Sequence, residues 1–201
     1  MSKSFIYKSS FVYELAMLLL YGRHYSARYS AIAELIPPGS SVLDLCCGPA
    51  LLYHRYLKLN SVQYTGLDIN AKFIDQLNRH GGNGRVWDLR SNESLPSADY
   101  VIMQASLYHF LPDATSVVER MIRAARKQVI IAEPIRNLSD SDSKLLAALG
   151  RLFTNPGTGE HQLRFTEQTL ADFFRAYSAQ VVQSFRIAGG REKVYVLRGQ
   201  R

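Results

Sequence analysis

The chain has 201 residues, of which 47% are hydrophobic and 20% charged, and this balance excludes an intrinsically disordered protein. Its length fits one domain with a substantial core. Lys and Arg number 24 against 17 Asp and Glu, so the formal net charge is +7. That excess is compatible with nucleic acid, an anionic membrane surface or an acidic substrate as a partner, but the basic residues are scattered, which favours solvated surface charge.

The two cysteines, Cys46 and Cys47, are adjacent in the sequence. Neighbours on a strand point to opposite faces, so these two are poorly placed to form a disulfide with each other. The sequence therefore offers no disulfide framework, which fits a reducing compartment and predicts a cytoplasmic protein. Cys and His residues do not cluster at metal-ligand spacing, so we expect no metal.

The first segment, residues 1–38, is predicted to form one or two helices that close at Pro37-Pro38-Gly39. Its apolar run from Phe11 to Tyr21 is interrupted by Glu14 and is not followed by a clear small-x-small cleavage site. The run is also shorter than the roughly 20 residues that cross a bilayer. We therefore expect a helical cap buried against the domain and no membrane span.

From residue 40 onward, strand and helix patterns alternate. Strands are predicted at 41–46, 62–69, 85–89, 99–104 and 128–132. Helices are predicted at 49–59, at 71–80 with Asn70 as the N-cap, and from Asp113 or Ser116 onward with an apolar stripe of Val117, Val118, Met121, Ile122 and Ala125. The end of that last helix is expected to carry Arg120, Arg123, Arg126 and Lys127, where cations complement the helix dipole. This alternation predicts an α/β fold with a parallel sheet and helices on both faces.

The end of the chain follows another pattern. Thr166 is expected to cap a helix through Tyr177, and strands at 180–187 and 193–197 are joined closely enough to form an antiparallel hairpin. The whole predicts a Rossmann-like seven-stranded sheet, mostly parallel, in a single domain over 1–201. Its parts are the cap (1–38), a core (39–134), an insertion (135–165) and the C-terminal helix and hairpin (166–201).

The insertion at 135–165 contains a predicted helix at about 141–153 and a loop rich in Gly and Pro. It leaves the sheet at the carboxyl ends of the strands, the edge where ligands bind in open parallel sheets. We expect a lid-like segment, with plain packing or a dimer surface as the open alternatives.

The segment 42–50, Val-Leu-Asp-Leu-Cys-Cys-Gly-Pro-Ala, joins the first strand to the next helix. Small residues at such a turn let a ligand approach the backbone. A carboxylate such as Asp44 can pair with an ammonium group, and the free N–H groups at a helix start can bind a carboxylate. Asp68 ends the second strand, 20 residues after Gly48. A carboxylate there can accept hydrogen bonds from ribose hydroxyls.

These residues resemble the motifs of class I S-adenosylmethionine-dependent methyltransferases, and Asp-Leu-Cys-Cys-Gly resembles the variant seen in quinone-biosynthesis-type methyltransferases. The resemblance implies that S-adenosyl-L-methionine is the cofactor. Ile131-Ala132-Glu133-Pro134 also resembles the family's fifth-strand motif. The chain departs from the family pattern at two glycines, which are replaced by Cys46 and Ala50. The implied cofactor-binding residues are Asp44, Cys46, Gly48, Asp68, Ile69 on the adenine face, Asp88 and Leu89 near the adenine amino group, and Gln104 and Ala105 facing the methionine moiety.

A nicotinamide-binding domain is the competing interpretation. It requires Gly-x-Gly-x-x-Gly at the start of the first helix, and the corresponding positions are Cys46, Gly48 and Leu51. Leu51 would stand where close packing of helix on strand needs glycine. The terminal hairpin also fits the methyltransferase topology better.

Methyl transfer from a sulfonium is an in-line displacement, so alignment of the acceptor can supply most of the rate. Candidate catalytic bases are His109, after the fourth strand, and His161, in the insertion. Tyr25, Tyr108 and Arg164 are candidate substrate-binding residues. The alternatives are that His109 caps a backbone carbonyl and that His161 and Arg164 are exposed loop residues.

The acceptor is predicted to be a small molecule. Enzymes that methylate exocyclic amines of bases usually carry Asn/Asp-Pro-Pro-aromatic after the fourth strand, where this chain has Gln104-Ala105-Ser106-Leu107. Methylation at carbon 5 of pyrimidines needs a cysteine nucleophile, and both cysteines lie in the cofactor loop. A lipid-like or aromatic acceptor would suit Phe11, Val12, Leu15, Leu18, Leu19 and Phe153, which are equally explained as ordinary core. A nucleic-acid or protein methyltransferase and a non-catalytic cofactor-binding module stay as alternatives, and the oligomeric state is open.

Overall fold

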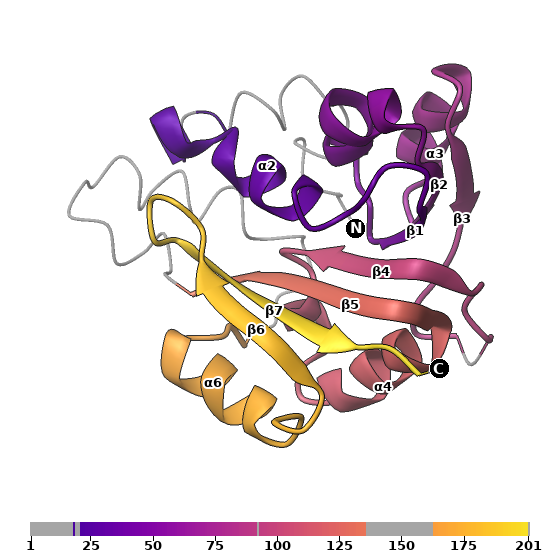
Figure 1. The fold of residues 1–201 in the computed structure, drawn as a ribbon. Coiled ribbons are helices and arrows are strands. Elements are labelled where there is room, and N and C mark those ends of the chain that lie inside the picture. The colour runs from indigo at the N-terminus through magenta and orange to yellow at the C-terminus, as the bar shows by residue number, and fades with distance from the viewer. Residues whose placement is uncertain (1–17, 19–20, 92, 136–162, 201) are drawn as a thin grey trace, which may run out of the picture.

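The computed structural model describes residues 18, 21–91, 93–135 and 163–200. These residues form a seven-stranded sheet in the order β3-β2-β1-β4-β5-β7-β6 (Figure 1). The first five strands pair in parallel, and β7 is antiparallel to both β5 and β6, which confirms the predicted fold and hairpin. The strands are β1 Ser41–Leu45, β2 Gln63–Asp68, β3 Asn83–Val86, β4 Ala98–Gln104, β5 Ala125–Pro134, β6 Val181–Arg186 and β7 Glu192–Arg198.

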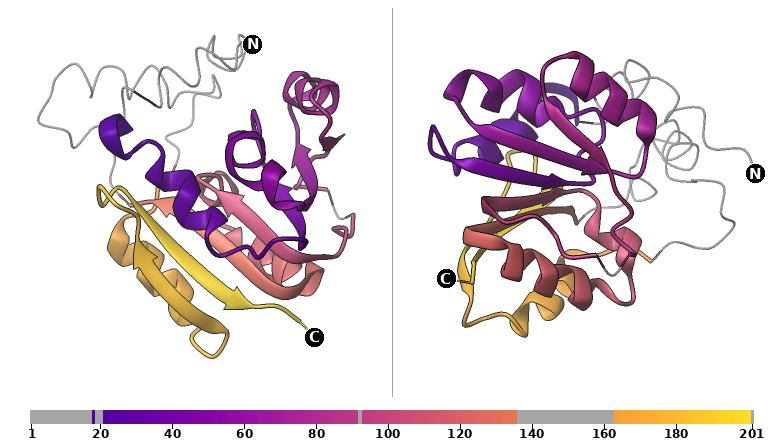
Figure 2. Two further views of the ribbon diagram at one scale, coloured as in Figure 1. Left: turned by 45° about the horizontal axis from the view of Figure 1, so that its top comes forward. Right: turned by 90° about the vertical axis from the view of Figure 1, so that its right-hand side faces the viewer.

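Helices cover both faces of the sheet, as Figure 2 shows. Helices α2 (Ala27–Ala33) and α3 (Ala71–Arg79) pack on one face, and α4 (Ala114–Ala124) and α6 (Glu167–Arg175) pack on the other. Short helical turns complete the described chain: η2 Gly22–His24, η3 Tyr53–Leu57, η4 Lys58–Asn60 and η5 Leu107–Phe110.

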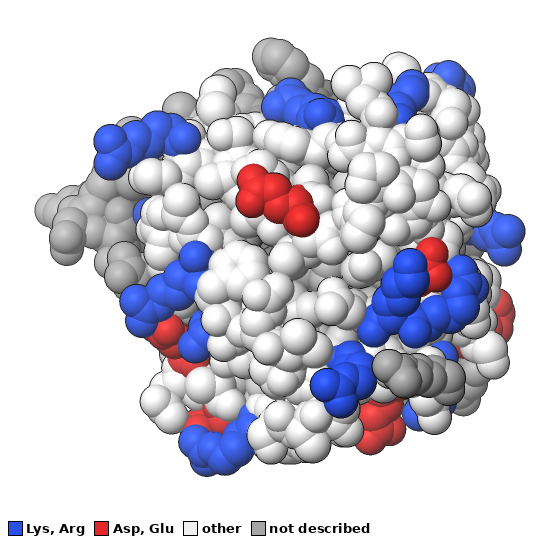
Figure 3. Space-filling view, in the orientation of Figure 1, with Lys and Arg blue, Asp and Glu red and all other residues white. Residues whose placement is uncertain are grey.

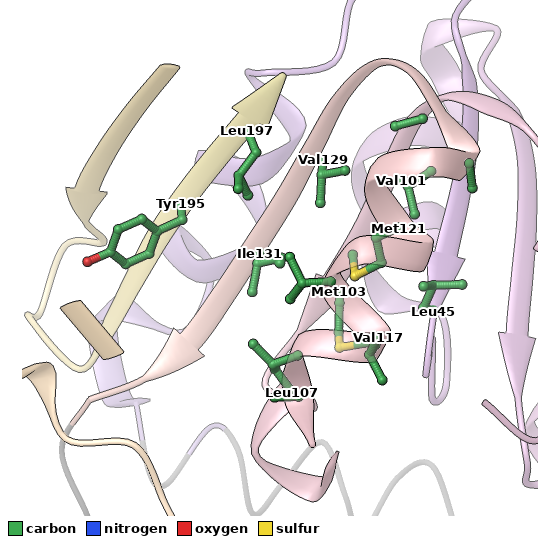
Figure 4. Packing of buried hydrophobic residues seen from close by; sticks show 14 of the residues in the cluster. Leu45, Val101, Met103, Leu107, Val117, Met121, Val129, Ile131, Tyr195 and Leu197 are labelled. Atoms are coloured by element: carbon green, nitrogen blue, oxygen red, sulfur yellow. The ribbon is translucent and has the colours of Figure 1, made fainter. Parts of the chain in front are cut away.

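The larger hydrophobic core lies between the central strands and α4 (Figure 4). Val101 and Met103 of β4 and Ile131 of β5 are at most 1% exposed and meet Val117 and Met121 of α4. Burying such side chains contributes roughly 1.5–3 kcal/mol each. Because helices cover both faces, the inner strands are apolar on both sides, which explains the continuous hydrophobic runs in the sequence.

The third strand differs from its prediction at 85–89. It spans Asn83–Val86, in parallel register with β2 from Thr65↔Asn83 to Asp68↔Val86. Pairing therefore stops where β2 itself ends. As a result, Asp88 lies two residues past the strand rather than at its end.

The fifth strand starts earlier than predicted, because α4 ends at Ala124 and β5 begins at Ala125 without a loop. Arg126 and Lys127 are therefore strand residues, and their placement at a helix end was wrong. Arg126 Nε lies 3.2 Å and Lys127 Nζ 4.0 Å from the carboxylate of Asp99.

The first predicted helix, 49–59, also begins later than expected. Ala50 has a left-handed backbone with φ 52°, which an α-helix cannot include, so helical structure starts at Leu51. It continues as the π-helical turn η3 and the 3₁₀ turn η4.

Two predicted helix caps are confirmed and one is partly wrong. Asn70 accepts a hydrogen bond from the backbone of Lys72 at 3.1 Å, and Thr166 forms a capping box with Thr169. Asp113 occupies the N-cap position of α4 but makes no side-chain cap bond.

Several predictions fall outside the described residues. The insertion at 135–165 is described only at Ile135 and 163–165, so its helix and His161 lie outside, as does most of the apolar run in the N-terminal segment. The division of the chain into cap, core, insertion and C-terminal part stays a prediction. Within the described ranges, no helix has the length and apolarity needed to cross a membrane.

Candidate cofactor site

The loop after β1 has an unusual backbone. Cys46, Gly48 and Ala50 all have positive φ, at 56°, 54° and 52°. Side-chain-bearing residues pay roughly 1–2 kcal/mol for this conformation. A Cβ atom added at Gly48 would meet nothing within 4 Å, so open space lies in front of the loop. A ligand can therefore approach this backbone closely, as the pattern of small residues predicted.

Asp68 fixes this loop from the end of β2. The backbone N–H of Gly48 donates to Asp68 Oδ2 at 2.9 Å, and that of Asn70 donates to Oδ1 at 2.7 Å. Burial raises the pKa of Asp68, while the two N–H donors lower it. Each carboxylate oxygen can accept a further hydrogen bond, so the group is held in one orientation with capacity left for ligand hydroxyls.

Asp44 lies deeper, one residue before the end of β1, and is 5% exposed. The Tyr64 hydroxyl donates to Asp44 Oδ2 at 2.7 Å. Burial raises the pKa of Asp44 to about 7, with the Tyr64 bond lowering it and the charge of Asp68 raising it. At neutral pH this carboxyl is therefore divided between its protonated and ionised forms, and a cation beside it would favour the ionised form.

Tyr64 is a supporting residue that sequence reasoning missed. Its ring stacks on Tyr53 with a centroid distance of 4.4 Å, which fixes the hydroxyl against Asp44. The signal lay in the strand register: Asp44 pairs with Gly66, and Tyr64, two residues earlier on β2, points to the same face as Gly66.

The carboxyl ends of β2 and β3 carry exposed apolar side chains beside a carboxylate. Ile69 is 64% and Val86 55% exposed. Asp88 is exposed, and its Oδ1 accepts from the backbone of Arg90 at 2.9 Å. The Leu89 side chain is 5% exposed and packs in the core, and the role of this residue near the adenine stays a prediction.

Glu133, at the end of β5, organises the loop that follows β4. It is fully buried, and its Oε1 accepts from the backbone N–H groups of Ser106 and Leu107, both at 2.7 Å. Burial raises the pKa of Glu133 to about 8. Ala105, just before this loop, has φ 52° and donates its N–H to Ala132 at 2.7 Å.

A buried ion pair ties the N-terminal segment to the same edge. Arg28 Nη2 lies 2.8 Å from Glu192 Oε1, with the two side chains 3% and 1% exposed. The Tyr21 hydroxyl donates to the same oxygen at 2.5 Å. The Gln104 side-chain amide donates to the Arg28 carbonyl at 2.9 Å, so it binds the N-terminal segment next to this ion pair. Sequence reasoning missed Arg28 and Glu192, because they lie far apart in the chain.

Tyr25, whose role in substrate binding stays a prediction, is buried among other aromatic rings. It is 5% exposed and packs edge-on against Tyr29, with ring centroids 5.6 Å apart. Its ring belongs to the hydrophobic cluster under α2. It therefore offers little surface to an acceptor.

The other described acceptor candidates come together on η5. The guanidinium carbon of Arg164 lies 3.8 Å from the Tyr108 ring centroid, and the Tyr108 and His109 rings are 4.0 Å apart. Burial lowers the pKa of His109 to about 4, and the charges of Arg164 and Arg90 lower it further. His109 is therefore a neutral imidazole at physiological pH. The backbone N–H of His109 donates to the Ser106 carbonyl. Within the described residues, the His109 ring makes no hydrogen bond to a backbone carbonyl.

The two thiols are unsuited to nucleophilic catalysis. Burial, with the negative charges of Asp44 and Asp68, raises the pKa of both Cys46 and Cys47. They stay protonated at neutral pH, and the thiolate is the nucleophilic form. Among the described residues, no group of three or more His, Cys, Asp or Glu is arranged to hold a metal.

A parallel sheet with left-handed loop backbone after β1 and carboxylates at the ends of β1 and β2 is an arrangement that suits a nucleotide-type cofactor. Residues 42–128 match the family model described as a methyltransferase domain. Over these residues, which are fewer than half of the chain, the protein is similar to the methyltransferase domain family, and the cofactor that this similarity implies is S-adenosylmethionine. A comparison with curated protein sequences finds no match.

Solved methyltransferase structures share this fold. The methyltransferase in a Haloferax volcanii complex with the activator Trm112 is 12% identical, with both chains covered in full and a TM-score of 0.68. Magnesium protoporphyrin IX methyltransferase from Synechocystis, with bound SAH, is 14% identical at 96% and 88% coverage, with a TM-score of 0.61. A TehB-like methyltransferase from Corynebacterium glutamicum is 16% identical at 91% and 92% coverage, with a TM-score of 0.60. At these identities the likeness concerns the fold alone.

Proposed function

We propose that the domain methylates a small-molecule acceptor at the carboxyl ends of β4 and β5. The observation that carries this proposal is the buried pair Arg28–Glu192, which fixes the N-terminal segment beside Gln104 at the end of β4. On the η5 side, Tyr108 and Arg164 lie near the same edge. An edge flanked in this way suits a small acceptor better than the surface of a folded macromolecule.

The cofactor site supports a division of roles among the carboxylates. Asp68 binds the ribose hydroxyls, Asp44 faces the ammonium group, and Asp88 lies near the adenine with Ile69 on its face. The backbone of Cys46 and Gly48 accommodates the close approach of the ligand. When bound, S-adenosylmethionine supplies a methyl group on a sulfonium.

His109 is the proposed catalytic residue on the acceptor side. A neutral imidazole can accept a hydrogen bond from the acceptor and orient it. Its lowered pKa makes it a weak base, so its contribution comes chiefly from alignment, which suits an in-line displacement.

Part of the positive net charge lies away from the proposed acceptor edge, at the amino ends of the strands. Arg126 and Lys127 are at the amino end of β5, roughly 20 Å along the strand from Glu133. Figure 3 shows Lys and Arg gathered round acidic atoms toward the right, the side where the C-terminus lies in Figure 1. Surface cavities of about 590 and 400 Å³ also lie on that side, lined in part by Arg198 and Gly199.

A labelling experiment tests the proposal. The protein is incubated with methyl-labelled S-adenosylmethionine and with the low-molecular-mass, RNA and protein fractions of a cell extract. We expect label in the low-molecular-mass fraction. His109→Ala should lower that rate by about tenfold or more while leaving cofactor affinity unchanged, because only acceptor alignment is lost.

The matched control is His80→Ala, which removes an exposed imidazole at the end of α3. Label that enters RNA or protein instead would contradict the small-molecule proposal. Cofactor binding without label in any fraction would favour the non-catalytic module.

Cofactor affinity should depend on pH through Asp44. An ammonium group binds the ionised carboxylate, so affinity should fall by up to about tenfold per pH unit below the Asp44 pKa of about 7 and level off above it. The same raised pKa means that free protein loses stability as pH rises toward 7, because ionisation is favoured in the unfolded chain. Calorimetric titration with S-adenosylhomocysteine across this range measures the effect.

Tyr64→Phe supplies the control for this prediction. Loss of the hydroxyl removes a bond that stabilises the carboxylate, so the midpoint of the affinity curve should move to higher pH. An affinity that is flat through neutrality would show that Asp44 does not meet the ammonium group.

A further inference from the structure

The turn η5 is flanked by two arginines from distant parts of the chain. Arg164 lies over the Tyr108 ring at 3.8 Å. On the other side, Arg90 Nη2 donates to the His109 carbonyl at 3.2 Å, and its guanidinium carbon is 5.5 Å from the Phe110 ring centroid. Each guanidinium is thus held by an aromatic ring on either side of His109.

The charges of these arginines are not balanced by carboxylates of the described residues. Arg126, Arg175 and Arg186 each form an ion pair, whereas within the described ranges Arg90 and Arg164 form none. Arg90 is exposed and Arg164 is partly buried, so both guanidinium groups can be reached by an anion from solution. Both charges act on His109, whose pKa they help to lower.

Two acidic residues next to this turn, Asp88 and Glu133, form no ion pair with Arg90 or Arg164. Asp88 is exposed, and its carboxylate accepts from the backbone N–H of Arg90 rather than from the guanidinium. Glu133, which holds the first residues of this loop, has its pKa raised to about 8 and is mostly protonated at neutral pH.

Stacking leaves a guanidinium able to bind an anion. Its N–H groups lie in the plane of the group, so contact with a ring face does not occupy them. Arg90 uses Nη2 for the His109 carbonyl, and Arg164 donates no hydrogen bond to a described residue. Planar donors of this kind match carboxylate and phosphate oxygens.

We propose that the methyl acceptor carries an anionic group, a carboxylate or a phosphate, which Arg90 and Arg164 bind beside His109. This inference rests on the proposed function, because it concerns the same acceptor edge. It narrows the substrate class to anions and gives the two arginines the role of selecting against neutral analogues.

Binding of matched probes tests the proposal. Calorimetry, with and without saturating S-adenosylhomocysteine, compares 4-hydroxybenzoate, phenyl phosphate and the neutral methyl 4-hydroxybenzoate. We expect at least one anion to bind about tenfold or more tightly than the ester. Whichever of the two anions binds more tightly shows whether the site prefers a carboxylate or a phosphate. The double variant Arg90→Gln/Arg164→Gln should abolish the difference and leave affinity for S-adenosylhomocysteine unchanged.

Two single variants sharpen the result. Arg164→Lys keeps the charge and should retain part of the anion preference, and Arg198→Gln, which removes an exposed cation from the amino side of the sheet, should retain all of it. Binding of the ester as tight as that of both anions, or a preference that survives in the double variant, would overturn the inference. Anion selectivity in a protein that binds no S-adenosylhomocysteine would support the anion site and contradict the cofactor assignments instead.

Discussion

Asp68→Ala is expected to weaken binding of S-adenosylhomocysteine on the order of a hundredfold or more. The variant loses charge-assisted hydrogen bonds to the ribose hydroxyls, each worth about 1.5–3 kcal/mol. It also removes the acceptor for the backbone N–H groups of Gly48 and Asn70, so the loop after β1 loses its anchor. Calorimetric titration measures the affinity, and circular dichroism measures whether the fold is retained.

Two further variants separate these contributions. Asp68→Asn keeps an oxygen for one loop N–H group but loses the charge, so it should bind more weakly than the natural protein and more tightly than the alanine variant. Asp75→Ala removes an exposed carboxylate from α3 and should bind normally. An unchanged affinity in Asp68→Ala would remove this residue from the ribose site.

Glu192→Ala should destabilise the fold by about 3–5 kcal/mol, because it leaves the Arg28 guanidinium buried without its carboxylate. That is a large part of the roughly 5–15 kcal/mol that holds a typical domain together. The variant also removes the Glu192 acceptor of the Tyr21 hydroxyl, so the N-terminal segment loses two contacts with Glu192 at once. Urea denaturation measures the change in free energy of unfolding.

A double variant that replaces both Arg28 and Glu192 tests whether the unpaired buried charge causes this loss of stability. Arg28→Met/Glu192→Leu leaves no buried charge behind and should recover most of the lost stability. Glu167→Ala removes a carboxylate from the solvent-exposed pair with Arg186 and should cost much less. Equal losses in Glu192→Ala and Glu167→Ala would show that burial of the Arg28–Glu192 pair does not matter.

The sequence predicted the fold well where the signal was local or periodic. The alternation of apolar strands and amphipathic helices was enough for the sheet, and short polar side chains located the caps at Asn70 and Thr166. The positions of Asp44 and Asp68 at strand ends could be predicted because a strand end is visible as the end of an apolar run. Parallel pairing then brings those ends to one edge.

What the sequence could not predict depends on contacts between distant segments. Arg28 and Glu192 look like surface residues until β7 brings Glu192 beside the N-terminal segment. The end of β3 is set by its partner β2, so the position of Asp88 could not be read from residues 83–89 alone. Arg90 was one basic residue among 24, and only its position against His109 distinguishes it.

The left-handed backbone at Cys46 and Ala50 has a consequence for how the loop meets its ligand. Residues with a Cβ atom adopt this conformation at a cost of roughly 1–2 kcal/mol each, so contacts of the folded domain, among them the bond from the Gly48 N–H to Asp68, must hold the loop in place. Part of the conformational cost of recognition is therefore met during folding, and the loop is shaped before the ligand arrives. Glycine at either position should relieve this strain, since glycine adopts positive φ freely, and should leave the empty loop with more conformational freedom to lose on binding.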